Sequence, residues 1–110
     1  MSILLAKCAA GAKLEPFVYT FLDNDGAAVD LTGYTGTVTW LRHSDDTSGE
    51  FAATATGGSA GTVTFTLPDA LTATEDVVDV QAWAGNSSIR LDGQRWRVVV
   101  AEAAGTAPSI

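Results

Sequence analysis

The side chains best suited to chemistry in this 110-residue chain are a single histidine, a single cysteine and thirteen carboxylates. His43 stands in a polar stretch with no cysteine nearby, so a zinc site there would depend on carboxylates, whereas structural zinc favours several Cys or His ligands. Cys8 has no neighbouring histidine that could activate its thiol. We therefore expect a surface histidine, a packed thiol and no catalytic centre, so that the chain is not an enzyme.

A second candidate is the turn Asp23-Asn24-Asp25-Gly26, which resembles the start of a calcium-binding loop. Such a loop needs a bidentate glutamate at its twelfth position, and the twelfth residue counted from Asp23 is Tyr34. A turn between two strands explains the same residues, because Asp and Asn side chains hydrogen-bond to their own backbone and Gly accepts a positive φ. We expect a turn here, and no metal or other cofactor in the chain.

Three tryptophans raise a different kind of chemistry, because an aromatic face can pack against the apolar face of a sugar ring. Trp40 and Trp96 fall on alternating positions that we expect to face the core. Trp83 shares a strand face with the polar residues Asp79 and Gln81, and it is the best candidate for an exposed contact. Two interpretations stay open for Trp83: an interface residue, or a residue packed on the second face of a sandwich.

Charge and cysteine content exclude several classes of partner. Six basic and thirteen acidic residues leave a formal charge of −7, which repels phosphate backbones and anionic lipid surfaces. The apolar run Ile3–Ala6 is far shorter than the ~20 residues of a membrane span, and shorter than the core of a secretory signal. Cys8 is alone, so no disulfide can form within the chain. We expect a protein that folds in a cytoplasm and binds neither nucleic acid nor membrane.

The elements that position these residues are short strands, since apolar and polar residues alternate with a period of two between turns rich in Gly, Asp and Asn. Asp92-Gly93 predicts a further hairpin turn, and residues 68–74 predict one short helical turn. The fold class that we predict is all-β, an antiparallel β-sandwich of about seven to eight short strands. The expected strands include residues 17–22, 35–42, 50–56, 62–67, 77–84, 89–91 and 95–101.

The same pattern divides the chain into three regions. Residues 1–14 form an N-terminal arm or a first edge strand, residues 15–101 the β-sandwich domain, and residues 102–110 a C-terminal tail. Both ends can add strands to a neighbouring subunit by β-augmentation, because sheet edges present unpaired backbone groups. A frayed terminus is the alternative for the tail. The interface candidates are Ile3, Leu4, Leu5, Trp83 and Ile110.

The order of motifs resembles a known family. After the aromatic strand and its Asp-Gly turn come VDLTGY (29–34), TVTW (37–40), GGSAGTVTFTLP (57–68), VVDVQAW (77–83) and RWRVVV (95–100). Across about Glu15 to Ala101, this order resembles the immunoglobulin-like N-terminal domain of phage upper baseplate proteins. The most recognisable element of that family is a DLTG segment after an extended, often aromatic strand, and here it is Asp30-Leu31-Thr32-Gly33.

The resemblance implies an immunoglobulin-like sandwich in a non-enzymatic bacteriophage structural protein, made in the host cytoplasm and built into the virion. Its expected partners are other virion proteins and copies of itself in a symmetric homo-oligomer. Its expected place is a baseplate or tail, a neck, or the capsid surface as a decoration protein. The alternative is a carbohydrate-binding or adhesive β-sandwich module, which depends on Trp83 and takes a host-surface glycan as its partner.

Overall fold

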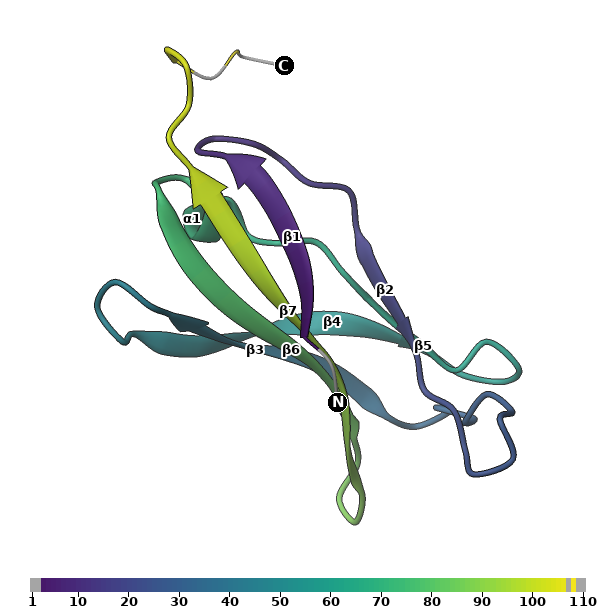
Figure 1. The fold of residues 1–110 in the computed structure, drawn as a ribbon. Helices are drawn as coiled ribbons and strands as arrows, with labels where there is room; N and C mark the ends of the chain where they lie inside the picture. Colours follow the sequence, from purple (N-terminus) through teal and green to yellow (C-terminus); the bar gives the residue numbers. More distant parts are fainter. Residues whose placement is uncertain (1–2, 107, 109–110) are drawn as a thin grey trace.

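Strands make up about half of the chain in the computed structural model, which describes residues 3–106 and 108 (Figure 1). The predicted all-β class and number of strands are confirmed, and so is the short helical turn after Pro68. Ile110, one of the predicted interface residues, lies outside the described residues. In chain order the elements are β1 (Ile3–Ala9), β2 (Phe17–Thr20), β3 (Thr35–Arg42), β4 (Ser48–Thr56), β5 (Thr62–Phe65), α1 (Asp69–Thr72), β6 (Asp76–Gly85) and β7 (Arg90–Ala101).

The seven described strands form one continuous, curled sheet in the order β1-β7-β6-β3-β4-β5-β2 (Figure 1). Strand β4 belongs to both halves of it, because residues 48–53 pair with β3 and residues 54–56 pair with β5. The half made of β5 and β2 thus folds over β3, β6 and β7, and side chains from the two halves meet in one core. This arrangement is a small β-sandwich, as predicted.

The pairing of β1 with β7 departs from the predicted antiparallel arrangement. Residues 3–9 run parallel to residues 95–101, and the two arrows in Figure 1 point the same way. Every other pair of neighbouring described strands is antiparallel. Side chains alternate in the same way in both kinds of pair, so the sequence pattern could not distinguish them. A parallel pair needs a long connection, and here nearly the whole chain lies between the two strands.

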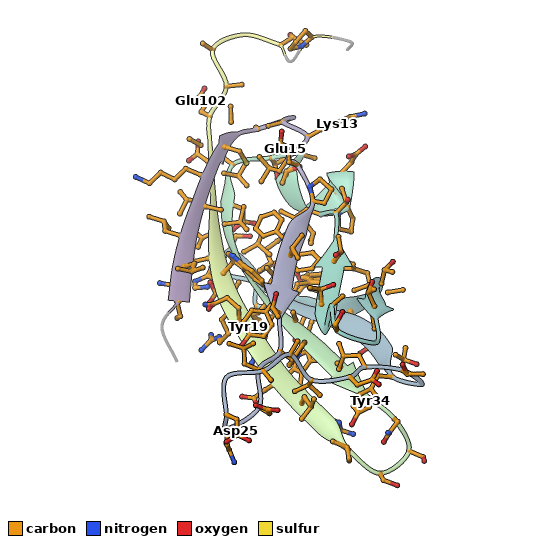
Figure 2. The ribbon with its side chains drawn as sticks, turned by 90° about the vertical axis from the view of Figure 1, so that its right-hand side faces the viewer. Lys13, Glu15, Tyr19, Asp25, Tyr34 and Glu102 are labelled. Carbon is orange, nitrogen blue, oxygen red and sulfur yellow. The ribbon has the colours of Figure 1, made fainter. Side chains whose placement is uncertain are left out.

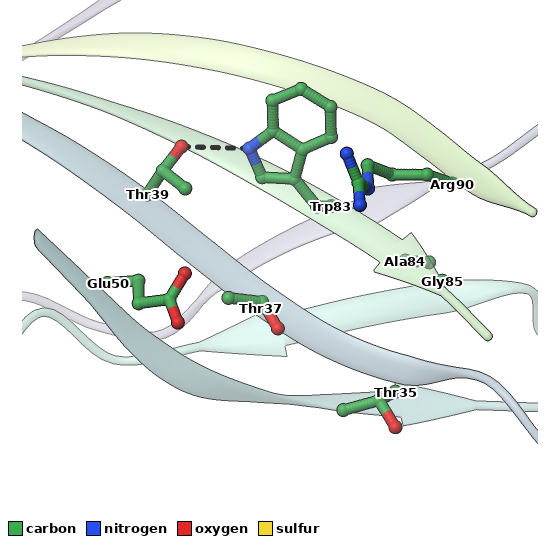
Figure 3. Close-up of a pocket in the computed structure, with 8 residues that line it drawn as sticks. All are labelled: Thr35, Thr37, Thr39, Glu50, Trp83, Ala84, Gly85 and Arg90. Carbon is green, nitrogen blue, oxygen red and sulfur yellow. Dashed lines mark hydrogen bonds between the residues drawn. The ribbon is translucent and has the colours of Figure 1, made fainter. Parts of the chain in front are cut away.

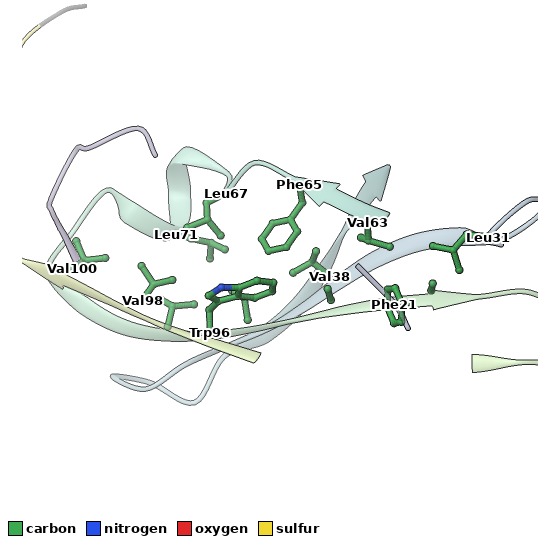
Figure 4. Packing of buried hydrophobic residues seen from close by; sticks show 14 residues of the cluster. Phe21, Leu31, Val38, Val63, Phe65, Leu67, Leu71, Trp96, Val98 and Val100 are labelled. Carbon is green, nitrogen blue, oxygen red and sulfur yellow. The ribbon is translucent and has the colours of Figure 1, made fainter. Parts of the chain in front are cut away.

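The core lies between the two layers (Figure 4). Trp96 is only 7% exposed, and its ring meets those of Phe17 and Phe65 edge-on, each at a centroid distance of 5.4 Å. The inward position predicted for Trp96 is confirmed, and Val38 on β3 is fully buried in the same core. Trp40 faces the same way but is only partly buried and packs against the border of the core.

The hairpin turn predicted at Asp92-Gly93 is wrong, because β7 runs through both residues without reversing. The register against β6 shifts there, so that the chain forms a β-bulge in place of a turn. A Cβ on Gly93 would lie 2.8 Å from the carbonyl oxygen of Ala82 and 3.0 Å from the rings of Tyr19 and Phe21. Glycine is therefore needed for the close packing of β7 and not for a tight turn.

The Asp30-Leu31-Thr32-Gly33 segment has a structural role in the loop between β2 and β3. Leu31 is buried in the core, at 1% exposure. One carboxylate oxygen of Asp30 accepts hydrogen bonds from the backbone N–H of Thr32 (2.9 Å), the hydroxyl of Thr32 (2.6 Å) and the backbone N–H of Gly58 (2.8 Å). The bonds from Thr32, and then the one from Gly58, lower the pKa of Asp30. The segment thus connects its own loop to the turn between β4 and β5.

Candidate interaction surfaces

Strand β1 forms a free edge of the sheet, since it pairs with β7 on one side and no described strand flanks it on the other. It begins with three consecutive apolar side chains that remain exposed: Ile3 at 42%, Leu4 at 50% and Leu5 at 58%. Native sheet edges usually carry charges or prolines that block pairing with other chains. The first charged residue of β1 is Lys7, so the start of this edge lacks such protection.

The three apolar side chains point to two different sides of β1. Leu4 is in register with the buried Trp96 and therefore faces the inner side of the sheet, whereas Ile3 and Leu5 face the outer side. Figure 2 shows β1 along one border of the molecule, with its side chains reaching away from it. Leu4 stays half exposed although it faces inward, because it stands at this border. A strand added beside β1 would cover Leu4.

The outer face of β6 and β7 carries a group of charges around Asp79, which is only 8% exposed. Arg97 donates two hydrogen bonds to its carboxylate, at 2.9 and 3.1 Å, and the Nη2 atom of Arg95 lies 3.8 Å from it. The Nε2 atom of His43, just beyond β3, lies 3.0 Å from the same carboxylate. Hydrogen bonding from Arg97, and then from His43, lowers the pKa of Asp79 against the opposing effect of burial. His43 is thus part of a hydrogen-bonded polar cluster that links β3, β6 and β7.

The other residues considered for chemistry occupy structural positions. Cys8 is partly buried on the inner side of β1, and burial raises the pKa of its thiol. The predicted turn at residues 23–26 is confirmed: Asp23 accepts hydrogen bonds from the backbone N–H groups of Asp25 and Ala27, and Gly26 has φ 82°. Within residues 3–106 and 108, no three His, Cys, Asp or Glu side chains are grouped as a metal site would require. No helix of this same part is long and apolar enough to cross a membrane.

Trp83 lies on the outer face of β6, away from the core, beside a groove of about 480 Å³ (Figure 3). It is partly buried, and its indole N–H donates a hydrogen bond of 2.8 Å to the hydroxyl of Thr39 on β3. It is therefore not packed between the two layers. The groove is lined by Thr35, Thr37, Thr39, Glu50, Trp83, Ala84, Gly85 and Arg90.

The structure brings the predicted interface residues together only in part. Ile3, Leu4 and Leu5 form the start of the β1 edge, whereas Trp83 lies on β6, on the far side of β7 from them. Sequence analysis missed the other members of the groove. Glu50 of β4 and Arg90 of β7 are far from Trp83 in the sequence, and no local signal could place them beside it.

The fold is similar to that of a solved phage protein domain. The N-terminal domain of phage TP901-1 ORF48 matches 92% of this chain over 86% of its own length, with a TM-score of 0.52 and 10% sequence identity. No family model matches the sequence, and no curated protein matches it. At this identity the similarity establishes the fold alone. At the level of the fold, it agrees with the resemblance to a phage protein that the order of motifs indicated.

Proposed function

We propose that this chain is a non-enzymatic structural component of a bacteriophage virion, which acts by assembling with copies of itself and with other virion proteins. The observation that carries the proposal is the free apolar edge of β1. The fold supports it, because most of the chain matches a domain of a phage protein. The formal charge of −7 favours protein partners over nucleic acid and membrane.

The location within the virion is the finer part of the proposal. The order of motifs around Asp30-Leu31-Thr32-Gly33 resembles upper baseplate proteins, which favours a baseplate or tail. The other locations for a small domain of this kind are the capsid surface, as a decoration protein, and the neck. In each case the chain is made in the host cytoplasm and then incorporated into the particle.

We also propose that the β-sandwich is related to the immunoglobulin fold. In an immunoglobulin domain, strands G, F and C lie in one layer and strands B, E and D in the other. When β1 to β7 are lettered A to G in chain order, β7-β6-β3 becomes G-F-C and β2-β5-β4 becomes B-E-D, which are the same two orders. The difference is that β4 continues from one layer into the other, so the sheet is not divided into two.

The mechanism that we propose for assembly is the addition of a partner strand to β1. Backbone hydrogen bonds along the free edge provide affinity, and the side chains that alternate along it provide specificity. The other end of the sheet is β2, whose Val18 is 57% exposed. Pairing β1 with β1 gives a two-fold dimer, whereas pairing β1 with β2 of the next copy gives a ring or a filament.

Replacing Leu5 by lysine tests this mechanism, because a charged side chain on an edge strand opposes the approach of a second strand. We expect Leu5→Lys to weaken self-association by up to roughly fivefold, because the lysine replaces an apolar cross-strand contact with the added strand on the outer side of β1. The matched control is Ile89→Lys, since Ile89 is 46% exposed and lies between β6 and β7, away from both edges of the sheet. Light scattering and sedimentation velocity at several concentrations measure the association.

Equal association of the parent and Leu5→Lys proteins would contradict a role for β1. So would a loss of association in Ile89→Lys that equals the loss in Leu5→Lys. The virion location has a separate test: mass spectrometry of purified particles from the phage that encodes the chain, followed by immunogold labelling. If the chain is absent from these particles, the proposed function is wrong.

A further inference from the structure

The groove beside Trp83 combines an aromatic ring with polar groups that have no other use in the fold. Glu50 contributes a carboxylate and Arg90 a guanidinium, and Thr35 and Thr37 add hydroxyl groups (Figure 3). Within the part of the chain that the structure describes, the side chains of Glu50 and Arg90 have no hydrogen-bond or ion-pair partner. Their hydrogen-bonding capacity is therefore available to a ligand.

The orientation of Trp83 is set before any ligand binds. Its indole N–H is already bonded to Thr39, on the neighbouring strand, at 2.8 Å. The group that Trp83 still offers to the groove is the surface of its ring. A ring held in place in this way loses little conformational entropy on binding, which favours affinity.

The charges of the groove favour a neutral ligand. Glu50 and Arg90 contribute one negative and one positive charge, so their sum is zero, and the whole chain carries −7. An anionic ligand would be repelled by the net charge of the chain, whereas a singly charged cation would pair with Glu50 and leave Arg90 without a partner. A ligand rich in hydroxyl groups satisfies both side chains, because a hydroxyl can donate to Glu50 and accept from Arg90.

The position of the groove argues against an extended peptide. It lies over β3, β4 and β6, whose backbone groups are already paired with one another in the middle of the sheet. A peptide strand binds best at a free edge, where unpaired N–H and C=O groups remain. A sugar ring has no such requirement: it presents hydroxyls around its rim and an apolar C–H face for the indole.

We propose that this groove binds a neutral carbohydrate, with a sugar ring stacked on Trp83 and its hydroxyls bonded to Glu50 and Arg90. The site is separate from the β1 edge, so the inference does not rest on the proposed assembly role. In a virion component, such a site gives contact with a glycan of the host surface.

The experiment uses the full chain labelled with ¹⁵N, together with an array of neutral, sulfated and sialylated glycans. Cellotetraose, maltotetraose and N-acetylchitotetraose are the probes for titration by NMR. We expect at least one neutral glycan to shift the indole signal of Trp83 but not those of Trp40 and Trp96. Glu50→Gln and Arg90→Ala should each weaken this binding roughly tenfold or more, as expected for the loss of a hydrogen bond to a charged group.

Controls separate binding from folding and from assembly. Glu102→Gln makes the same change as Glu50→Gln on an exposed residue outside the groove, and it should bind as the parent does. Trp83→Ala removes the stacking ring and should abolish the binding. Trp83→Phe keeps an aromatic ring in case the alanine variant does not fold, and thermal melting checks each variant. Leu5→Lys should bind the glycan normally, which keeps failure of the assembly proposal distinct from failure of this one.

Three results would overturn the inference. The first is that no neutral glycan of the array or of the three probes moves the Trp83 signal. The second is binding that stays unchanged in both Glu50→Gln and Arg90→Ala. The third is a preference for sulfated or sialylated glycans, or occupation of the groove by a protein partner.

Discussion

At the scale of single residues, Asp30 shows how a recognisable motif can have a structural explanation. Its carboxylate accepts three hydrogen bonds, and one of them comes from Gly58, which lies 28 positions away in the sequence. In the sequence, the Asp30-Leu31-Thr32-Gly33 segment stood out through its resemblance to a motif of phage upper baseplate proteins. The bond to Gly58 could not be predicted, because it depends on how the turn between β4 and β5 folds back onto this loop.

We expect Asp30→Ala to lower the melting temperature by several degrees, because the N–H groups of Thr32 and Gly58 lose their acceptor. Asp25→Ala is the matched control: Asp25 is also an exposed loop aspartate, and no hydrogen bond to its carboxylate is found among the described residues. Thermal melting by circular dichroism measures both. Equal melting temperatures for the two variants would contradict the role assigned to Asp30.

At the scale of elements, β7 shows where local sequence signals are ambiguous. An Asp-Gly pair between apolar residues is typical of a hairpin turn, yet Asp92 and Gly93 continue the strand through a bulge. Glycine is common both in tight turns and at β-bulges, so the local sequence does not separate them. The packing of Gly93 against Tyr19, Phe21 and Ala82 decides between them.

We predict that Gly93→Ala destabilises the protein by about 1–3 kcal/mol, the usual cost of inserting a group into a well-packed region. The added Cβ would lie 2.8 Å from the backbone oxygen of Ala82, which cannot move away as a flexible side chain can. Urea unfolding monitored by tryptophan fluorescence gives the free energy of unfolding. A variant as stable as the parent would contradict the close packing of β7 at this point.

At the scale of the whole molecule, several carboxylates make the stability of the fold depend on pH. Hydrogen bonds lower the pKa of four of them below the usual value; these are Asp30, Asp45, Asp76 and Asp79. A lowered pKa in the folded state means that the group stabilises the fold at pH values above its unfolded pKa of about 3.9. This stabilisation is lost as the pH falls through the folded pKa, so we expect acid to weaken the fold below about pH 4.

Asp79→Asn isolates one part of this effect, because Asp79 pairs with Arg97 and His43 across three strands. At pH 7 we expect the variant to be less stable than the parent by about 1 kcal/mol or less, since Arg97 and His43 remain partly exposed to solvent. The difference should shrink as the pH falls through the folded-state pKa of Asp79, because Asp79 itself then becomes protonated. Unfolding free energies across the pH range test this, and a difference that does not change with pH would contradict it.

The sequence by itself determined that the chain is all-β, which faces of the main strands point to the core, and where most turns fall. These features depend on the alternation of side chains and on turn preferences among near neighbours. They can therefore be inferred from each short segment of sequence without knowing its partners in the sheet. The tertiary structure alone decided the parallel pairing of β1, the passage of β7 through Asp92 and Gly93, and the meeting of Trp83, Glu50 and Arg90 in one groove. Each of these depends on which distant segment lies alongside, and that is set by the packing of the whole sheet.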